Sequence, residues 1–492
     1  MHSRNLSLAV SFSTAMNKKL LLQFGIVLFV LLLMAFHQGP IGRQAAFHPD
    51  TTAPAWLKAK DYKGKSVVNT SGVISFTTGL ENDFYPVDSI NKSGELYVEI
   101  ALGKLLNLPD KRTPLNISIV IDRSGSMTGV KMGYAKKAAK GIIDHLQPED
   151  FVSVVMYDNA IDSVQEPVAA VNKDEIKSRI DRITPRGSTN LWGGTEKGYE
   201  YVRRHYRPGC INRVLLISDG LANVGLTDSV RIRRNVQRYK DDEGITLSTF
   251  GVGLDYNETL MTNMAETGAG NYYFIDTPDR IQQLFDQELN GLLNAVALDA
   301  TLEIKLPEGV QLQKGYPLKY AQNGRVLTMR LRDLFADEIK STWFHFINPG
   351  INTVLAFEST LRYTDVLDGK QKEVTNRNEL SPIRTLDAYL THFNKPVIEQ
   401  VILFTANENL EKAMALVDNG QLKDADGLLG DNVNAIRSNA YFKDSKALQR
   451  MDSMNTRYRQ IAANSAAMNR DSLQRWQKQS KSVNYQIRNK KQ

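Results

Sequence analysis

Residues 117–127 read ISIVIDRSGSM, an apolar β-branched run that ends in a carboxylate and a turn of serine and glycine. A second run of this kind, VLLISDG, occupies residues 214–220. Runs at Phe151–Met156, Leu247–Val252 and Tyr272–Ile275 are also typical of strands buried on both faces. Helical patterns lie between the runs, at Val130–Leu146, Asp174–Ile183, Thr195–His205, Ser229–Tyr239, Asn257–Ala265 and Pro278–Leu289. The alternation predicts a doubly wound, mostly parallel α/β sheet at residues 115–294.

Short β-type runs separated by turn residues flank this α/β domain. We expect residues 66–112 and 297–385 to be two parts of one β-sandwich, with the α/β domain inserted in it or joined to it. Residues 396–465 lose the β-branched residues and predict a helical hairpin, whose first helix stops at Asn419-Gly420. Residues 41–65 have the composition of a linker, and residues 466–492 form a basic tail.

Oxygen-bearing side chains follow the two central strands of the predicted sheet. Asp122, Ser124 and Ser126 come directly after one strand, and Asp219 follows the other. In an open α/β sheet, ligands bind beyond the carboxyl ends of the strands. The loop at residues 187–189, Gly-Ser-Thr, should lie at the same edge and bring Thr189. Two carboxylates and three hydroxyls without His or Cys favour Mg²⁺, Mn²⁺ or Ca²⁺ over Zn²⁺ or copper.

The D-x-S-x-S pattern of Asp122, Ser124 and Ser126, with Thr189 in G-S-T and Asp219 in S-D-G, resembles the metal-ion-dependent adhesion site of von Willebrand factor A domains. The resemblance covers residues 115–289 and fills every position of the motif. It implies that the three hydroxyls contact the metal, and that both aspartates contact it directly or hold its water. It also implies a protein partner whose acidic residue completes the metal shell. The wider layout is similar to that of bacterial envelope A-domain proteins.

Simpler interpretations exist for several of these residues. The D-x-S-x-S turn is also a good helix-capping sequence. Asp158 and Asp255 lie near strand ends, and we expect them to be loop or cap residues rather than ligands. The single cysteine, Cys210, excludes an intrachain disulfide and is expected to be half-buried. Met127 beside the site is expected to be a packing residue.

An apolar run at residues 20–36 follows two lysines. This pattern predicts that residues 1–40 are a signal peptide or an amino-terminal membrane anchor. At 1.5 Å per residue the run spans about 26 Å, slightly less than a typical hydrocarbon core. Either alternative places the remainder of the chain outside the cytoplasm, anchored to the inner membrane or secreted across it.

The net charge of +7 belongs to the end of the chain. Residues 443–492 contain twelve basic and three acidic residues, so the rest of the sequence has a small net negative charge. A solvated helical surface is the simplest interpretation, and an acidic partner or anionic lipid is the next. We expect no nucleic-acid partner, because Trp476 and Tyr485 are too few for a stacking platform.

These patterns predict a divalent-metal-dependent protein-binding module of the cell envelope, for adhesion or complex assembly. The alternative is an accessory subunit of a membrane transport or channel complex, and a metal-dependent hydrolase is the least favoured. We expect no catalytic residue and no organic cofactor. His145 and His205 lie in predicted helices, and neither a phosphate loop nor a G-x-S-x-G elbow occurs.

Overall fold

The computed structural model describes residues 56–464 apart from 57–58, 88–92, 104–111, 254–255, 276–282, 285–287, 289–293, 349, 351 and 439–441, together with residue 478. The predicted signal peptide or anchor and most of the predicted linker and basic tail lie outside these residues. Within the described part of the chain, no helix combines the length and the apolar character needed to cross a membrane.

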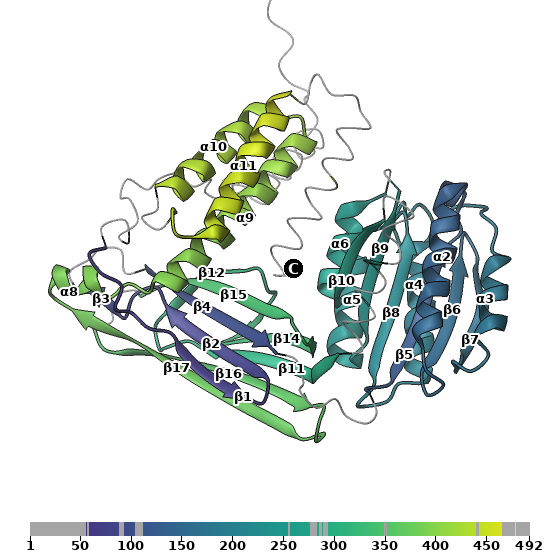
Figure 1. The fold of residues 1–492 in the computed structure, drawn as a ribbon, viewed down its shortest axis with the longest axis horizontal. Helices are drawn as coiled ribbons and strands as arrows, with labels where there is room; N and C mark the ends of the chain where they lie inside the picture. The colour runs from purple at the N-terminus through teal and green to yellow at the C-terminus, as the bar shows by residue number, and fades with distance from the viewer. Residues whose placement is uncertain are drawn as a thin grey trace, which may run out of the picture. The chain divides into compact units, whose positions relative to one another are not determined.

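The α/β domain is built on a six-stranded sheet in the order β10-β9-β8-β5-β6-β7 (Figure 1). Its strands are β5 (Leu115–Asp122), β6 (Phe151–Tyr157), β7 (Ile161–Ala169), β8 (Ile211–Ser218), β9 (Thr246–Val252) and β10 (Ala269–Ile275). All neighbours pair in parallel except β6 and β7, which are antiparallel. Every residue of β5, β8 and β9 is buried, which explains their continuous apolar runs.

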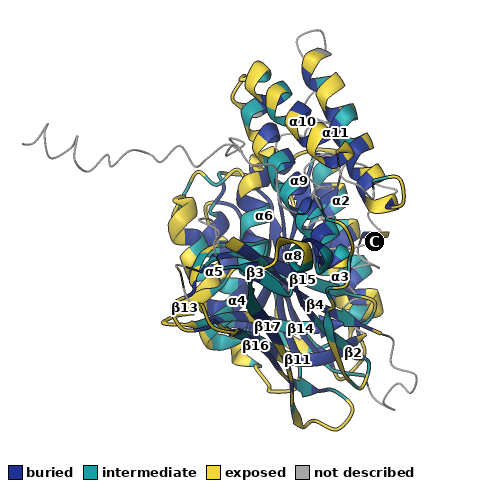
Figure 2. Cartoon of the chain, turned by 90° about the vertical axis from the view of Figure 1, so that its left-hand side faces the viewer, coloured by how far each residue is buried: buried dark blue, intermediate teal, exposed yellow. Residues whose placement is uncertain are grey.

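Helices cover both faces of this sheet. They are α2 (Val130–His145), α3 (Lys173–Asp181), α4 (Leu191–Arg204), α5 (Ser229–Glu243) and α6 (Glu258–Thr267). Side chains of α2 and α3 share one buried cluster with the sheet, and those of α4, α5 and α6 share another. In Figure 2 the helices have exposed residues on their outer sides, while strands in the interior of the chain are mostly buried. The predicted doubly wound fold is therefore confirmed.

Two details of the α/β domain differ from the sequence prediction. Helix α4 begins at Leu191 rather than Thr195, because the Asn190 side chain caps it by accepting a hydrogen bond from the Gly193 amide at 3.1 Å. Strand β7 was not expected. It is an edge strand with alternating partial exposure, and so lacks the continuous apolar run of the central strands.

The flanking segments form a β-sandwich from both sides of the α/β domain. Its strands are β1 (Val67–Ser71), β2 (Ile74–Leu80), β3 (Phe84–Pro86), β4 (Ser93–Leu102), β11 (Ala295–Lys305), β12 (Gln311–Tyr316), β13 (Ala321–Asn323), β14 (Val326–Phe335), β15 (Ile339–Ile347), β16 (Leu355–Asp365) and β17 (Gln371–Ile383). The two sheets have the orders β1-β2-β4-β15-β12 and β13-β14-β11-β16-β17-β3. Strand β4 pairs with β15 from Ser93 to Ala101, which joins the two halves of the sequence. Residues of both sheets share one apolar core.

Among the described residues, the carboxyl-terminal region contains three long helices rather than the two of the predicted hairpin. Helices α9 (Lys395–Asp418), α10 (Leu422–Arg437) and α11 (Lys446–Asn464) share a buried cluster, and the short α8 (Leu386–Thr391) precedes them. The predicted stop at Asn419-Gly420 is confirmed, with Gly420 at φ 76°. Helix α11 was missed because its polar residues outnumber the apolar ones that contact α9 and α10.

A half-buried carboxylate lies where α9 meets the sandwich. Burial raises the pKa of Glu411 to about 7, with a further contribution from the charge of Glu408, while a hydrogen bond with Tyr316 opposes the shift. Asn407 donates to the Tyr316 hydroxyl at 3.0 Å in the same contact.

Stability of this contact should therefore fall as the pH rises. The protonated carboxyl of Glu411 is favoured in the folded state, so its contribution is complete below the ordinary pKa of 4.5 and is lost as the pH approaches about 7. The loss amounts to at most about 3 kcal/mol. We expect Glu411→Gln to reduce the difference in melting temperature between pH 5 and pH 8, measured by calorimetry. An unchanged difference would contradict this assignment, and Glu399→Gln on the same helix is the control.

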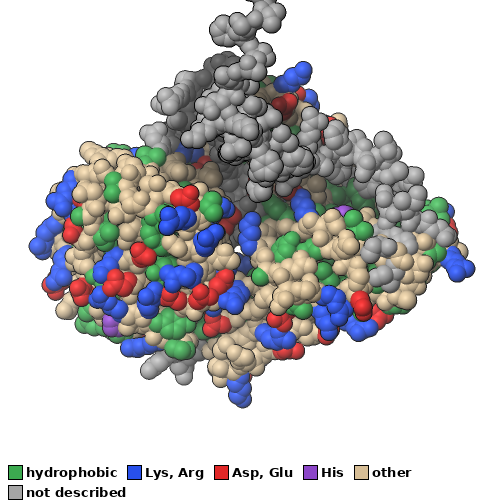
Figure 3. Space-filling model, turned by 180° about the vertical axis from the view of Figure 1, so that it is seen from behind, with side chains coloured by type: hydrophobic (Ala, Val, Ile, Leu, Met, Phe, Trp, Pro, Cys, Tyr) green, Lys and Arg blue, Asp and Glu red, His purple; other side chains and the backbone are tan. Residues whose placement is uncertain are grey.

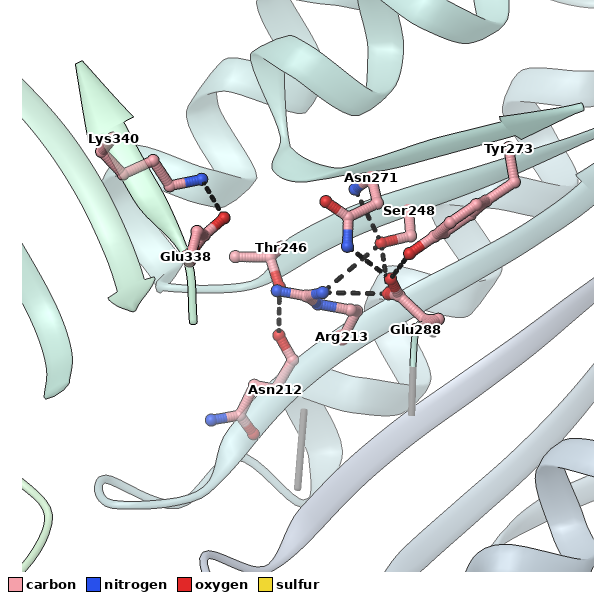
Figure 4. A network of polar contacts seen from close by, with 9 residues as sticks. All are labelled: Asn212, Arg213, Thr246, Ser248, Asn271, Tyr273, Glu288, Glu338 and Lys340. Atoms are coloured by element: carbon pink, nitrogen blue, oxygen red, sulfur yellow. Dashed lines mark hydrogen bonds and ion pairs between the residues drawn. The ribbon is translucent and has the colours of Figure 1, made fainter. Parts of the chain in front are cut away.

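A buried ion pair joins β8 to Glu288, a helical residue near the end of the α/β domain (Figure 4). The Arg213 guanidinium lies 2.9 Å from the Glu288 carboxylate, and the two side chains are 1% and 0% exposed. Ser248 and Asn271 each donate to Glu288 at 2.6 Å, and Tyr273 donates at 2.9 Å. Burial alone would raise the pKa of Glu288, but the charge of Arg213 and the hydrogen bonds from Ser248 and Asn271 lower it. The pair therefore fixes Glu288 against the sheet as a charged group.

Charged side chains of both signs are interspersed on the face of the molecule shown in Figure 3. This mixture agrees with a sequence whose positive surplus is concentrated after residue 442. The described surface on that face therefore offers no broad field of a single sign to a partner.

Candidate metal centre

The two predicted carboxylates emerge at the same edge of the α/β sheet. Asp122 is the last residue of β5, and Asp219 directly follows β8. The two strands are parallel neighbours with Ile121 paired to Ile217. Parallel strands in this register place their carboxyl ends side by side, so both aspartates belong to one edge.

The loop after β5 is organised by Asp122, which is fully buried. One carboxylate oxygen accepts from the Ser124 amide at 2.8 Å, and the other accepts from the Ser218 hydroxyl at 2.6 Å. The chain then makes a short 3₁₀ turn, η2 (Gly125–Met127). The hydroxyl oxygens of Ser124 and Ser126 lie 3.0 Å apart, so both serines present oxygen in the same place.

Backbone hydrogen bonds hold the Thr189 loop against the Asp122 loop. The Gly125 amide donates to the Gly187 carbonyl at 3.0 Å, and the Arg186 amide donates to the Arg123 carbonyl at 2.7 Å. Thr189 itself is 2% exposed, and its carbonyl accepts from the amides of residues 223 and 224, each at 3.1 Å. Thr189 therefore connects the Asp122 loop to the segment that follows Asp219.

Asp219 has one paired and one unpaired carboxylate oxygen. Lys131 Nζ lies 3.1 Å from Oδ2 of Asp219. The other oxygen, Oδ1, is buried and has no hydrogen-bond partner among the described residues. An orphaned carboxylate oxygen is costly unless a donor or a cation satisfies it, so this atom fits a metal ligand.

Electrostatics also favour a cation at this edge. Burial raises the pKa of Asp122 and the nearby charge of Asp219 raises it further, while hydrogen bonds from Ser218 and Ser124 oppose the shift. Two carboxylates that destabilise each other's charge gain most from a shared positive ion. Among the described residues there is no group of three or more His, Cys, Asp or Glu side chains that could hold a metal ion. The candidate centre therefore depends on hydroxyls as well as carboxylates, a donor set suited to a hard cation such as Mg²⁺.

The structure connects the segments of all the predicted ligands, while metal ligation by Asp122, Ser124, Ser126, Thr189 and Asp219 stays a prediction. Sequence reasoning missed Lys131 and Ser218. Ser218 directly precedes Asp219, but a serine at the end of a strand does not by itself indicate a hydrogen bond to Asp122. Lys131 could have been noticed in the sequence, because a cation in the first turn of a helix is disfavoured by the helix dipole and so indicates a nearby negative charge.

Asp158 is a loop residue, as expected from its position after a strand, and it forms ion pairs with two arginines. Burial acts to raise its pKa, but the Ala160 amide and the guanidinium groups of Arg186 and Arg123 outweigh burial, and the pKa is lowered. Arg123 is nearly buried, whereas the Arg186 side chain is 63% exposed. Asp158 thus holds Arg123 and Arg186 in place beside the candidate centre. Asp255 lies outside the described residues.

Apolar side chains are exposed beside the same loops. Val130 follows the D-x-S-x-S turn and is 68% exposed, and Leu221 lies two residues after Asp219 and is 39% exposed. Met127 is fully buried, which confirms that it is a packing residue. Cys210 has intermediate exposure, as expected. Val130, Leu221 and Arg186 form what we call the rim of the candidate centre.

Comparison with known proteins shows which family the α/β domain resembles. Residues 116–287 match the family model of the von Willebrand factor type A domain. Protein YfbK of Escherichia coli (strain K12) is 34% identical over 192 residues, which cover 39% of this chain and 33% of YfbK. Protein sll0103 of Synechocystis sp. is 26% identical over 299 residues, which cover 58% of this chain and 70% of that protein. This chain thus spans about a third of the length of the first relative.

A solved structure extends the likeness beyond the α/β domain. The von Willebrand factor type A protein from Catenulispora acidiphila has a TM-score of 0.63 with this chain at 16% identity. The match covers 79% of this chain and 91% of that one, and it shows a shared fold.

Proposed function

We infer, from the von Willebrand factor A domain that residues 116–287 form, that this chain binds a protein partner through a divalent cation at the carboxyl end of the sheet. The observation that carries this proposal is the orphaned carboxylate oxygen of Asp219, buried at an edge where hydrogen bonds connect the three predicted ligand segments. Domains of this family are typically metal-dependent protein-interaction modules.

The residues would hold the cation as follows. The hydroxyls of Ser124, Ser126 and Thr189 supply neutral oxygen, and Asp122 and Asp219 supply charge directly or through water. Asp122 is held in place by Ser218. When bound, Mg²⁺, or Mn²⁺ or Ca²⁺ in its place, supplies an electrophilic position that attracts a carboxylate. A partner's Asp or Glu side chain would complete the shell.

The rim supports an acidic partner rather than a small ligand. Arg186 is positioned by Asp158 at 2.9 Å and stays largely exposed. It can pair with a second acidic group of the partner, while Val130 and Leu221 can be buried against apolar side chains. A carboxylate between apolar groups, with a further acid nearby, is the surface that this rim fits.

The histidines of the α/β domain support binding rather than catalysis. His145 Nδ1 lies 2.8 Å from the Gly141 carbonyl, one turn earlier in α2. The His205 ring stacks on Phe151 with 4.6 Å between ring centroids. Both rings are engaged with other groups, so neither is positioned as a general base for the candidate centre.

The proposed place of action is the cell envelope. The apolar run at residues 20–36 and its two preceding lysines support export or anchoring of the chain. Adhesion or assembly of an envelope complex is the role that joins this segment to a metal-dependent binding domain. Anchoring would keep the partner at the membrane.

A capture experiment tests this function. The full chain should retain a partner from the membrane fraction of its own cells in Mg²⁺ and release it in EDTA. Asp219→Asn should lose roughly 90% or more of the captured protein, because it removes the charge of one proposed ligand. Asp174→Asn, at an exposed surface pair on α3, should capture as much as the natural chain. Capture that persists in EDTA and in Asp219→Asn would refute the proposal.

A further inference from the structure

The Lys131 side chain lies within the candidate centre. It is the second residue of α2, and its ammonium group lies 3.1 Å from Oδ2 of Asp219. The Lys131 side chain is 17% exposed and that of Asp219 is 0% exposed, so the pair is largely removed from water. Attraction between these two charges is therefore stronger than in a surface ion pair.

A glycine lies against the Lys131 side chain. A Cβ added at Gly253 would lie 2.5 Å from Cε of Lys131, closer than real contacts allow. Gly253 also has φ 85°, a conformation that disfavours other residues. The loop after β9 thus leaves room for the lysine stem beside Asp219.

The position of Lys131 in the first turn of α2 is electrostatically unfavourable for the helix. A cation in the first turn of a helix is disfavoured by the helix dipole, whose positive end lies there. Lys131 nevertheless points to Asp219, the residue that also has the orphaned oxygen Oδ1. Asp219 therefore has one oxygen committed to the lysine and one available to a cation.

We propose that Lys131 sets the charge of the metal centre and thereby commits the loaded centre to an anionic partner. Asp122 and Asp219 bring two negative charges, and Lys131 returns one positive charge. A divalent cation then leaves the centre with a surplus of one positive charge, which a partner's carboxylate neutralises. Without Lys131 the loaded centre would be neutral, and a bound carboxylate would leave it negative. This inference rests on the proposed function.

Lys131 should weaken binding of the metal and strengthen binding of a carboxylate, and both affinities can be measured. Lys131 repels the incoming cation, so Lys131→Met should bind Mn²⁺ on the order of tenfold more tightly, in titrations followed by electron paramagnetic resonance. Lys131→Arg keeps the charge and should stay within about twofold of the natural chain. Lys140→Met is the matched control, because Lys140 lies on the same helix and pairs with the exposed Asp181.

Acetate is the probe for carboxylate binding to the loaded centre. Its binding to the Mn²⁺-loaded chain displaces metal-bound water and lowers the water-proton relaxation rate. We expect acetate to bind Lys131→Met roughly fivefold or more weakly than it binds the natural chain or Lys140→Met. The loss arises because one positive charge next to the metal has been removed.

Three results separate this proposal from the function on which it rests. Equal Mn²⁺ and acetate affinities in Lys131→Met and Lys140→Met would overturn the role of Lys131. If Asp122→Asn still loses Mn²⁺ in that case, the metal-dependent function stands. Failure of the natural chain to bind Mn²⁺ would overturn both.

Discussion

Replacing Asp122 by asparagine is expected to lower the affinity of the chain for Mg²⁺ by roughly 100-fold or more, because loss of even an outer-shell partner can cost 10–100-fold. The new side chain would keep an oxygen for the Ser124 amide, while its amide group would face Ser218. The substitution therefore removes a charge with little change in shape. Calorimetric titration with Mg²⁺ measures the effect.

Asp144→Asn is the control for this experiment. Asp144 lies on α2 and pairs with Lys177 at the surface, so its loss should leave Mg²⁺ affinity unchanged. Circular dichroism should show the same helix content in both variants. Mg²⁺ affinity that is equal in Asp122→Asn and Asp144→Asn would refute the candidate centre.

Replacing Arg213 by methionine is expected to destabilise the α/β domain by about 3–5 kcal/mol, because it leaves the Glu288 carboxylate buried without a counter-ion. Burial of both side chains excludes water as a replacement partner. Hydrogen exchange of the β8 and β9 amides measures this loss within the multidomain chain.

The surface pair of Arg203 and Glu243 provides the comparison. The Arg203 side chain is 49% exposed, so Arg203→Met should cost only about 0–1 kcal/mol. The double variant Arg213→Met/Glu288→Gln should recover part of the loss, since it also removes the buried negative charge. Equal protection of β8 in Arg213→Met and Arg203→Met would contradict a structural role for the ion pair.

The central strands could be predicted because burial on both faces leaves a continuous apolar run. Strand β5 has eight buried residues in succession, and a run of this length bounded by turn residues is typical of a strand inside a parallel sheet. Strand β7 could not be predicted, because it is an edge strand that is stabilised by hydrogen bonds to β6. A pattern of neighbouring residues in the sequence does not contain this pairing. Helix α11 depends in the same way on α9 and α10.

The candidate centre was predictable where its residues follow strands or belong to the quoted Gly-Ser-Thr loop. Asp122 and Asp219 are placed by the chain topology, so a local motif finds them. Lys131 and Arg213 act through partners that are distant in sequence, Asp219 and Glu288. Arg213 stands in a strand whose residues are all buried, so its charge indicates a buried counter-ion, but the sequence does not show which residue that is.

Insertion of the α/β domain between β4 and β11 has a mechanical consequence. Strand β4 lies inside one sheet of the sandwich, between β2 and β15, and β11 lies inside the other, between β14 and β16. Tension applied by a tethered partner would be divided between two covalent attachments. Each attachment pulls on an interior strand that is hydrogen-bonded on both sides, so releasing either strand requires two ladders of hydrogen bonds to break instead of one.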